Sequence, residues 1–448
     1  MPETSTQQAY NDLLQSIESG GLRYAQTLLN SLKAGEIAHL IESLPPKEGQ
    51  IIWDLLDHKL EGEVLVEVGD EVQHRLMGDM KPEDLAAVTD NMDTDDLADF
   101  LQSLPSKLTD QVLKSLDVQQ RKRLDKVLAY PEDSAGGLMN TDTITIRSQV
   151  TLDVVLRYLR RRGKLPPQTD SLIVVDGNDN YLGTLPVTTL LTSLPDVSVY
   201  EVMDTKIEAI LADTTDTAVA KIFETQDLIS APVIDENNKL LGRITIDDVV
   251  DVIRDDAEHS MMGMAGLTEE TDLFAKALPS AKRRAIWLGI NLLTAFMASW
   301  VVDQFEATIA QVVTVAVLMN IVASMGGIAG TQTLTLVIRG MALEQVTQQN
   351  IRYLFTKEIF VGVINGVLWA LVVALIAGLW FQNIEIGFII AAAITINLFF
   401  AAFSGVAIPL ILRKLKIDPA IAGSVILTTV TDIVGLLSFL GLATLFLM

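Results

Sequence analysis

The sequence predicts a multidomain membrane protein: an all-α superhelical amino-terminal domain, an α/β domain pair, a connecting helix, and a polytopic α-helical membrane domain with five transmembrane helices. Three observations predict this class. The 448-residue chain has a formal net charge of −24 but a positive mean hydropathy of +0.35. Residues 1–272 carry a net charge of −27, whereas residues 273–448 carry +3 and contain long apolar runs. Two segments of the acidic part repeat, at spacings of 60 and 59 residues.

Composition excludes several classes of function. A chain this acidic repels phosphate, so we expect no nucleic-acid partner. The absence of cysteine excludes disulfides, thiolate metal sites and cysteine catalysis. The sequence contains no phosphate-binding loop and no nucleophile–base pair, and its four histidines are scattered. We therefore expect that the protein is not an enzyme. The amino-terminal residues MPETSTQQAYNDLL also lack the basic and apolar regions of a signal peptide.

Residues 1–130 are predicted to form a helical superhelix. Ser43-Leu-Pro-Pro-Lys returns 60 residues later as Ser103-Leu-Pro-Ser-Lys, and each copy precedes a Leu-rich amphipathic stretch. A helix that ends at Leu-Pro and is followed by another amphipathic helix is typical of a short solenoid. An acidic cluster within this region, which includes Asp95 and Asp99 four residues apart, is suited to attract cations.

Residues 131–250 contain two copies of a strand–turn–strand–helix pattern. The turns are Asp176-Gly-Asn-Asp-Asn and Asp235-Glu-Asn-Asn, and Leu-Gly follows each of them. This pattern resembles a tandem pair of cystathionine-β-synthase (CBS) domains, which bind adenosine nucleotides or ions. The resemblance places Thr245 and Asp248 at a ribose-binding half-site, whereas the first copy has Pro186 and Thr189 at the same positions. Only the second copy therefore has the residues of an ATP-binding half-site, and the sequence slightly favours the absence of ATP binding.

Residues 251–280 are predicted to form an acidic connecting helix. Asp247, Asp251, Asp255 and Glu258 recur at helical spacing and would form one acidic stripe. Like charges four residues apart destabilise a helix by a few tenths of a kcal/mol. A solvated face is one explanation. The other is neutralisation by divalent cations, which would give a physical basis for a cation-sensing switch.

Residues 281–448 contain five runs long enough to cross a membrane, because a ~30 Å hydrocarbon core needs about 20 helical residues. Basic residues occupy every second loop, so the positive-inside rule places the amino-terminal part in the cytoplasm. We expect a multi-pass protein of the cell (inner or plasma) membrane, in contact with the lipid bilayer. The expected spans are 284–303, 309–337, 358–381, 386–412 and 420–447.

Asp432 lies in the middle of the fifth run, with no other charge within thirteen residues on either side. An ionised carboxylate at the bilayer centre costs at least ~2.5 kcal/mol, so it is expected to face a partner, a cavity or an ion path. Thr428 and Thr429 share its helix face, and such oxygen ligands suit a hard cation such as Mg²⁺ or Ca²⁺. The alternative is a protonated aspartate that only fastens helices together.

Glycines interrupt the second run between Met325 and Gly330, and we expect a broken or re-entrant helix there. Such a break would expose carbonyl groups beside an ion path, whereas tight packing is the simpler explanation for any single glycine. The predicted pore-lining residues are Asn320, Gly326, Gly327, Thr331, Gln332, Thr428, Thr429 and Thr431.

The order of these parts resembles the MgtE family of magnesium channels over essentially the whole chain. Three stretches carry the resemblance: Tyr130-Pro-Glu-Asp-Ser-Ala-Gly-Gly-Leu-Met, the glycine run that includes Gly330 and Gln332, and Asp418-Pro-Ala-Ile-Ala-Gly with Asp432 and Gly435 after it. The sequence departs from the family at Ile328 and Thr431, where the family often has Asn.

The resemblance implies a homodimer whose pore is lined by the second and fifth spans, with Asp432 binding hydrated Mg²⁺. It also implies that cytosolic Mg²⁺ closes the pore through the connecting helix. With the acidic stripe added, the candidate metal ligands are Asp432, Asp418, Asp95, Asp99, Asp227, Asp248, Asp251, Asp255, Asp256 and Glu258.

The leading hypothesis is a Mg²⁺-selective channel that mediates magnesium influx and closes when Mg²⁺ binds its acidic cytosolic domains. A cation-coupled secondary transporter of Co²⁺ or Mn²⁺ is the alternative, because membrane carboxylates also serve ion coupling. A third reading is a membrane-tethered nucleotide sensor, against which Asp432 argues.

Overall fold

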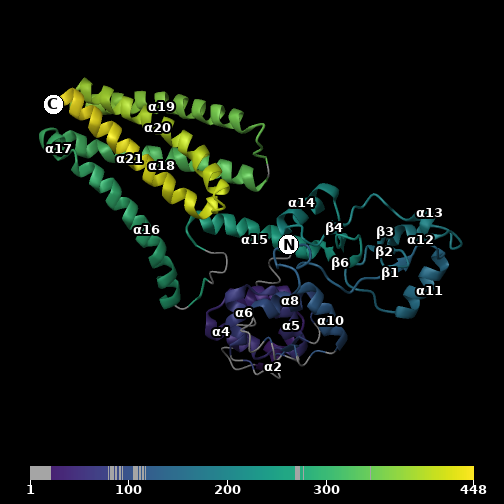
Figure 1. The fold of residues 1–448 in the computed structure, drawn as a ribbon. Coiled ribbons are helices and arrows are strands. Elements are labelled where there is room, and N and C mark those ends of the chain that lie inside the picture. Colours follow the sequence, from purple (N-terminus) through teal and green to yellow (C-terminus); the bar gives the residue numbers. More distant parts are fainter. Residues whose placement is uncertain are drawn as a thin grey trace. The chain divides into compact units, whose positions relative to one another are not determined.

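A computed structural model of the chain describes residues 22–448, apart from 79, 81–84, 86–87, 90–91, 93, 104–108, 110–111, 114–115, 117, 268–272, 276 and 344. The chain divides into two compact units. The first contains Met1–Ala257 and Glu270–Ala275, and the second contains Glu258–Glu269 and Lys276–Met448. The ribbon in Figure 1 follows the order of the elements along the chain.

Short helices form the amino-terminal part of the first unit. Their apolar faces share one core, which includes Trp53, Leu65 and Phe100. Pro46 opens α4 at its first turn, where a missing N–H group costs nothing, so Leu-Pro does separate consecutive helices as the sequence predicts. The described helices are α2 (Leu22–Leu29), α3 (Ala34–Glu42), α4 (Pro46–Trp53), α5 (His58–Glu67), α6 (Asp70–Met77), α8 (Thr94–Ser103) and α10 (Val118–Val127).

The predicted α/β repeat forms two three-stranded sheets, with strand orders β1-β2-β3 and β4-β5-β6. In each sheet the first pair of strands is parallel and the second is antiparallel. The first copy contains β1 (Thr145–Arg147), α11 (Leu152–Arg162), β2 (Ser171–Val175), β3 (Tyr181–Pro186), α12 (Val187–Thr192) and α13 (Val199–Val202). The second contains β4 (Ile210–Leu211), α14 (Asp216–Gln226), β5 (Ser230–Ile234) and β6 (Leu240–Thr245).

The two hairpin turns close in the same way. Asp176 accepts hydrogen bonds from the backbone N–H groups of Asn178 and Asn180 at 2.8 and 2.9 Å. Asp235 repeats this geometry in the second copy. Each turn also contains a residue in the left-handed region, which Asp and Asn tolerate better than most residues. The turn signals in the sequence therefore predicted both hairpins correctly.

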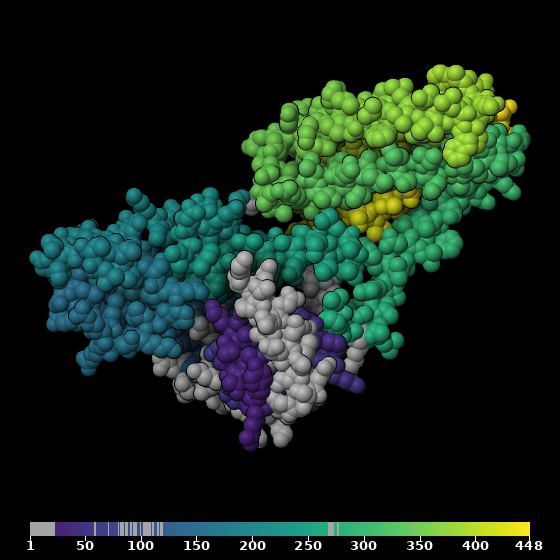
Figure 2. Space-filling view, turned by 180° about the vertical axis from the view of Figure 1, so that it is seen from behind, coloured from purple at the N-terminus to yellow at the C-terminus, as the bar shows by residue number. Residues whose placement is uncertain are grey.

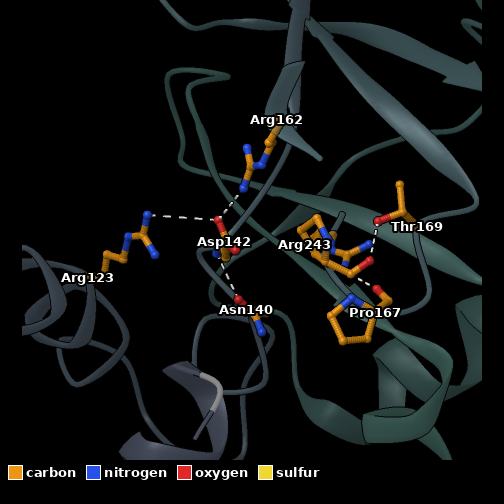
Figure 3. Close-up of polar contacts among 8 residues, drawn as sticks. Arg123, Asn140, Asp142, Arg162, Pro167, Thr169 and Arg243 are labelled. Atoms are coloured by element: carbon orange, nitrogen blue, oxygen red, sulfur yellow. Dashed lines mark hydrogen bonds and ion pairs between the residues drawn. The ribbon is translucent and has the colours of Figure 1, made fainter. Parts of the chain in front are cut away.

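Polar contacts join the two copies and the helical part (Figure 3). Asp142 lies between two guanidinium groups, 3.1 Å from that of Arg162 on α11 and 3.9 Å from that of Arg123 on α10. Arg243 of β6 is buried and donates to the backbone oxygen of Pro167 at 2.7 Å, in the segment before β2. These contacts fix the first unit internally.

In the described part of the second unit, five helices are each long and apolar enough to cross a membrane. They are α16 (Ala277–Asp303), α18 (Val313–Ala342), α19 (Ile351–Phe381), α20 (Ile384–Lys414) and α21 (Pro419–Leu447), with the short α17 (Glu306–Gln311) after α16. The expected number of spans is confirmed, but most of them extend further than predicted. The expected break in the second span is wrong, because α18 is one continuous helix.

Helix α20 lies at the core of this unit and is the most buried of the five. Small residues allow α19 to approach it closely: a Cβ atom on Gly362 would lie 2.6 Å from the Cβ of Ala402. In the space-filling view of Figure 2, only small parts of α21 (yellow) are visible between the green helices. The apolar side chains of α16 and α19 point outward instead, as expected for helices that face lipid or another chain.

Helix α15 (Ile246–Met264) follows β6 directly and therefore begins before the predicted connecting helix at 251. It ends where Gly266 adopts a left-handed conformation and Leu267 N–H bonds back to the Met262 oxygen at 3.0 Å. The boundary between the two units falls inside this helix, after Ala257.

Candidate functional site

Helix α21 presents a polar face that includes Asp432. Ser424, Thr428 and Asp432 recur every four residues, with Thr428 exposed and Asp432 half-buried. The Thr428 hydroxyl donates to the Ser424 backbone oxygen at 2.9 Å, and the Thr429 hydroxyl donates to the Val425 oxygen at 2.8 Å. Because these hydroxyl protons point back into the helix, the oxygen lone pairs remain available to a cation or its water shell.

Helix α18 presents a second polar face. Asn320, Ser324, Thr331 and Gln332 are exposed, and Gly327 between them is half-exposed. The Thr331 hydroxyl donates to the Gly327 backbone oxygen at 2.9 Å, the same arrangement as on α21. The two helices pack against each other, since a Cβ atom on Gly330 would lie 3.0 Å from Leu427 of α21. Sequence reasoning missed Ser324, although its four-residue spacing from Asn320 was a visible signal.

Two predicted pore-lining residues lie inside the bundle instead. Thr431 is fully buried, and its hydroxyl is 3.1 Å from the backbone oxygens of both Leu427 and Thr428. Gly326 is buried against Asn397 of α20. Burial separates both residues from the exposed polar faces, so neither lines a path along those faces.

The carboxy-terminal end of α15 packs on the start of α21. His259 Nε2 lies 2.6 Å from Asp418 Oδ2, and Asp418 Oδ1 accepts the Ala420 N–H at 2.7 Å as the N-cap of α21. A Cβ atom on Gly263 would lie 3.3 Å from side-chain carbons of both Ala420 and Ile421. One turn of α15 therefore contacts the amino-terminal turn of the helix that carries Asp432.

The amino-terminal part of α15 carries acidic residues that meet acids from other elements of the first unit. Burial, together with the charges of Asp247 and of Asp96 on α8, raises the pKa of Asp248 to about 7. The Thr245 backbone N–H and hydroxyl each donate to Asp248 at 3.1 Å, which limits this rise. The same hydroxyl contacts Asp247, and Gln168 Nε2 donates to Asp247 at 2.6 Å.

Two further acidic meeting points lie along α15. Desolvation and the charge of Asp251 raise the pKa of Glu67, at the end of α5. Desolvation is also the main cause that raises the pKa of Asp216 on α14, and Asp133 and Asp256 add to it. Arg254 is the local counter-ion, 3.2 Å from Asp251 and 3.4 Å from Asp255. Glu67 and Asp216 were not predicted, because their partners are distant in sequence.

The remaining predicted metal ligands are more scattered. Asp227 is exposed and ends α14 in a left-handed conformation, and Glu258 is exposed on α15. Asp95 and Asp99 belong to α8, but their side chains lie outside the described part of the structure. Among the described residues, no three His, Asp or Glu side chains converge closely enough to hold a metal ion.

The membrane unit also contains a carboxylate that the sequence analysis did not single out. Glu358 of α19 is buried, with Lys357 Nζ 2.9 Å from Oε1 and the Thr333 hydroxyl 3.3 Å from Oε2. Its neighbour Lys357 lies directly before the predicted start of the third span, and no feature of the sequence there marks a buried carboxylate. Only the packing of α18 against α19 reveals that the carboxylate points inward.

Three family models match most of the chain. A model described as a divalent cation transporter, MgtE, matches residues 319–442. The MgtE intracellular N domain matches residues 32–133, and the CBS domain matches residues 135–196 and 199–255.

Two curated relatives are similar over nearly their full length. The magnesium transporter MgtE of Bacillus subtilis (strain 168) is 28% identical over 442 residues, which cover 98% of each chain. The magnesium transporter MgtE of Thermus thermophilus is 28% identical and covers 97% of this chain and 98% of its own. Among solved structures, the cytosolic domain of the Mg²⁺ channel MgtE in complex with ATP aligns with a TM-score of 0.51 at 28% identity, covering 54% of this chain and 99% of that one.

Proposed function

Because the chain belongs to the MgtE family of magnesium transporters, we propose that it carries Mg²⁺ across the cell membrane along the polar faces of α18 and α21. It is a multi-pass membrane protein and not an enzyme. One observation carries the ion path: two helices that pack against each other, α18 and α21, each expose polar groups, which together include hydroxyl, amide and carboxylate groups. Such groups are costly against lipid and are expected to face water, an ion or another chain.

We infer that these faces are covered by a second copy of the chain. A single copy leaves Asp432 and Thr428 open on one side, and a two-fold axis along that side would bring two equivalent carboxylates to one path. Two Asp432 carboxylates at the axis would attract a divalent cation by their charge. The cation would arrive hydrated, because Mg²⁺ gives up its water shell reluctantly. We therefore base the proposed selectivity for Mg²⁺ on two Asp432 carboxylates that face each other across the two-fold axis.

Closure by cytosolic Mg²⁺ is the second part of the proposal. At each of the acidic meeting points along α15, the neighbouring carboxylates repel one another. A divalent cation that binds between them would relieve this repulsion. The same helix ends against Ala420 and Asp418 at the start of α21. A cation bound at Asp248, Asp251 or Asp256 would therefore favour one position of α15 and bias the helix that carries Asp432. This arrangement requires the amino-terminal part to lie in the cytoplasm.

Nucleotide binding remains a lesser part of the proposal. The Thr245 hydroxyl and the Asp248 carboxylate, expected to hold a ribose, are hydrogen-bonded to each other. A nucleotide would have to displace that bond, so we propose that ATP binds weakly at most and does not control transport.

Mg²⁺ flux into proteoliposomes tests the ion path. Asp432→Asn keeps the volume of the side chain but removes the charge, so we expect Mg²⁺ uptake to fall by about two orders of magnitude or more while the protein stays folded. The matched control is Asp303→Asn at the exposed end of α16, which should keep uptake near the wild-type rate. Full uptake by the Asp432 variant would overturn the assignment.

A coupled transporter is the second candidate, and buried Glu358 is the observation that favours it. In that case uptake would require a proton or Na⁺ gradient, and Glu358→Gln would abolish the requirement. A passive channel predicts that Mg²⁺ flux follows its own electrochemical gradient alone, with both gradients collapsed.

A further inference from the structure

A polar side chain lies between two glycines at the centre of the membrane unit. Asn397 of α20 is fully buried, and its Nδ2 donates to the backbone oxygen of Val322 in α18 at 2.8 Å. A Cβ atom on Gly326 of α18 would lie 2.2 Å from this nitrogen. A Cβ atom on Gly435 of α21 would lie 2.6 Å from it. Any other residue at either glycine would therefore collide with the amide.

The amide of Asn397 is only half satisfied. Its nitrogen must face Val322, because a backbone carbonyl only accepts hydrogen bonds. Its Oδ1 is buried and has no hydrogen-bond partner among the described groups. A leucine has the same branched shape and would carry no unpaired acceptor. A buried acceptor without a partner lowers stability, so an asparagine at this position indicates a role other than filling space.

Asn397 touches both helices of the proposed ion path from behind. Gly435 follows Asp432 by three residues on α21, and Gly326 lies two residues after Ser324 on α18. The amide is therefore in contact with the inner side of each helix, close to the level of the residues on its polar side. With no side chain on either glycine, α18 and α21 both lie directly against the amide at this level.

We propose that Asn397 is a positioning residue that fixes the separation of α18 and α21 at the level of Asp432, and thereby determines which divalent cation passes. The inference rests on the proposed function in taking these two helices as the ion path. Selection between Mg²⁺ and the larger Ca²⁺ depends on the size and rigidity of a site. A hydrogen-bonded amide between two helices supplies a fixed distance.

Reciprocal substitutions test the contact in the full-length protein. Gly326→Ala and Gly435→Ala should each lower Mg²⁺ flux into proteoliposomes by about tenfold and lower the thermal midpoint, because each added methyl meets the amide. When combined with Asn397→Ala, either change should return flux and midpoint to within about twofold and a few degrees of Asn397→Ala alone. Gly441→Ala, whose Cβ would meet nothing within 4 Å, is the control.

Selectivity separates positioning from plain packing. Asn397→Leu keeps the branched shape, with methyl groups bulkier than the amide, but loses the bond to Val322, so the Ca²⁺-to-Mg²⁺ flux ratio of the folded protein should rise about threefold or more. An unchanged ratio, with flux falling only in proportion to the folded fraction, would overturn the proposal. So would glycine effects that persist in the Asn397→Ala background. A wrong ion path would give a different result. Asp432→Asn would then keep full Mg²⁺ flux, while Asn397→Ala would still rescue the thermal stability of the glycine variants.

Discussion

Asp248 is held by a short network at the first turn of α15. Its carboxylate accepts two hydrogen bonds from Thr245, yet burial and the neighbouring acids raise its pKa from 3.8 to about 7. The folded protein therefore keeps a proton at this site at pH values where the unfolded chain has lost it. The raised pKa favours the folded state at low pH, and this contribution disappears as the pH rises towards 7.

The pH dependence of unfolding checks this network. The free energy of unfolding should fall as the pH increases from about 4 to about 7, and Asp248→Asn should flatten that part of the profile. Hydrogen bonds from its own turn lower the pKa of Asp235, so Asp235→Asn should act in the opposite direction and lose its effect at low pH. Thermal unfolding between pH 4 and pH 8 without divalent cations is the measurement. A profile of Asp248→Asn that parallels the wild type would contradict the assignment.

Asp418 makes two contacts that can be separated. Asp418→Ala removes both the N-cap of α21 and the contact with His259, and loss of an N-cap costs about 1 kcal/mol. Asp418→Asn keeps the cap, because asparagine caps helices as well as aspartate does. We expect thermal stability in the order wild type, Asp418→Asn, Asp418→Ala. His259→Ala should then resemble Asp418→Asn more closely than Asp418→Ala.

Single residues were predictable from the sequence only where their type is unusual for their surroundings. Asp432 stands out because no other charge lies near it in an apolar run. Asn397 and Glu358 do not stand out, since their importance comes from Gly326, Gly435 and Thr333 on other helices. Contacts of this kind depend on which helix faces pack, and one sequence does not contain that information.

At the scale of elements, periodicity and turn chemistry predicted most of the fold, but two helices were misjudged. Helix α18 was expected to break at its glycines, yet these glycines allow close approach of α20 and α21 and the helix continues. Helix α15 was expected to begin at 251, but Thr245 and Asp248 form a capping arrangement that starts it at Ile246. Length and hydropathy nevertheless gave all five spans.

Substitutions of increasing size at Gly263 would disturb the contact between α15 and α21 to different degrees. A Cβ atom there would lie 3.3 Å from Ala420 and Ile421, so Gly263→Ala needs only small shifts, whereas Gly263→Leu cannot fit without moving α15. We expect Gly263→Ala to keep closure by cytosolic Mg²⁺, and Gly263→Leu to raise the Mg²⁺ concentration for half-closure about tenfold or more. Patch-clamp recordings at graded cytosolic Mg²⁺ measure this. Equal closure of both variants would contradict transmission through this contact.

For the whole molecule, the division of charge was the most informative property of the sequence. It separated an acidic first part from a slightly basic membrane part and correctly predicted the class of fold. The pairing of acids was not predictable. Glu67 of α5 and Asp251 of α15 come together only because the helical superhelix packs on α15 within the first unit.

A stability comparison tests whether the acidic part binds divalent cations specifically. Simple screening acts through ionic strength, so about 10 mM MgCl₂ and about 30 mM NaCl should stabilise equally if charge screening is the only effect. We expect the thermal midpoint of the full-length protein to rise by several degrees more in MgCl₂. In a variant with Asp248, Asp251 and Asp256 all changed to Asn, the two salts should act alike. No difference between the salts in the wild type would argue for a merely solvated acidic surface.

Arg254 gives the acidic stripe a counter-ion of its own. Because its guanidinium already contacts Asp251 and Asp255, a divalent cation that arrives there does not join an empty surface but exchanges with a cation built into the chain. Exchange of this kind would lower the apparent affinity of the stripe for Mg²⁺ and would move the proposed closure to a higher Mg²⁺ concentration. If the stripe senses Mg²⁺ as proposed, this one arginine offers a means of adjusting the threshold without altering any of its carboxylates.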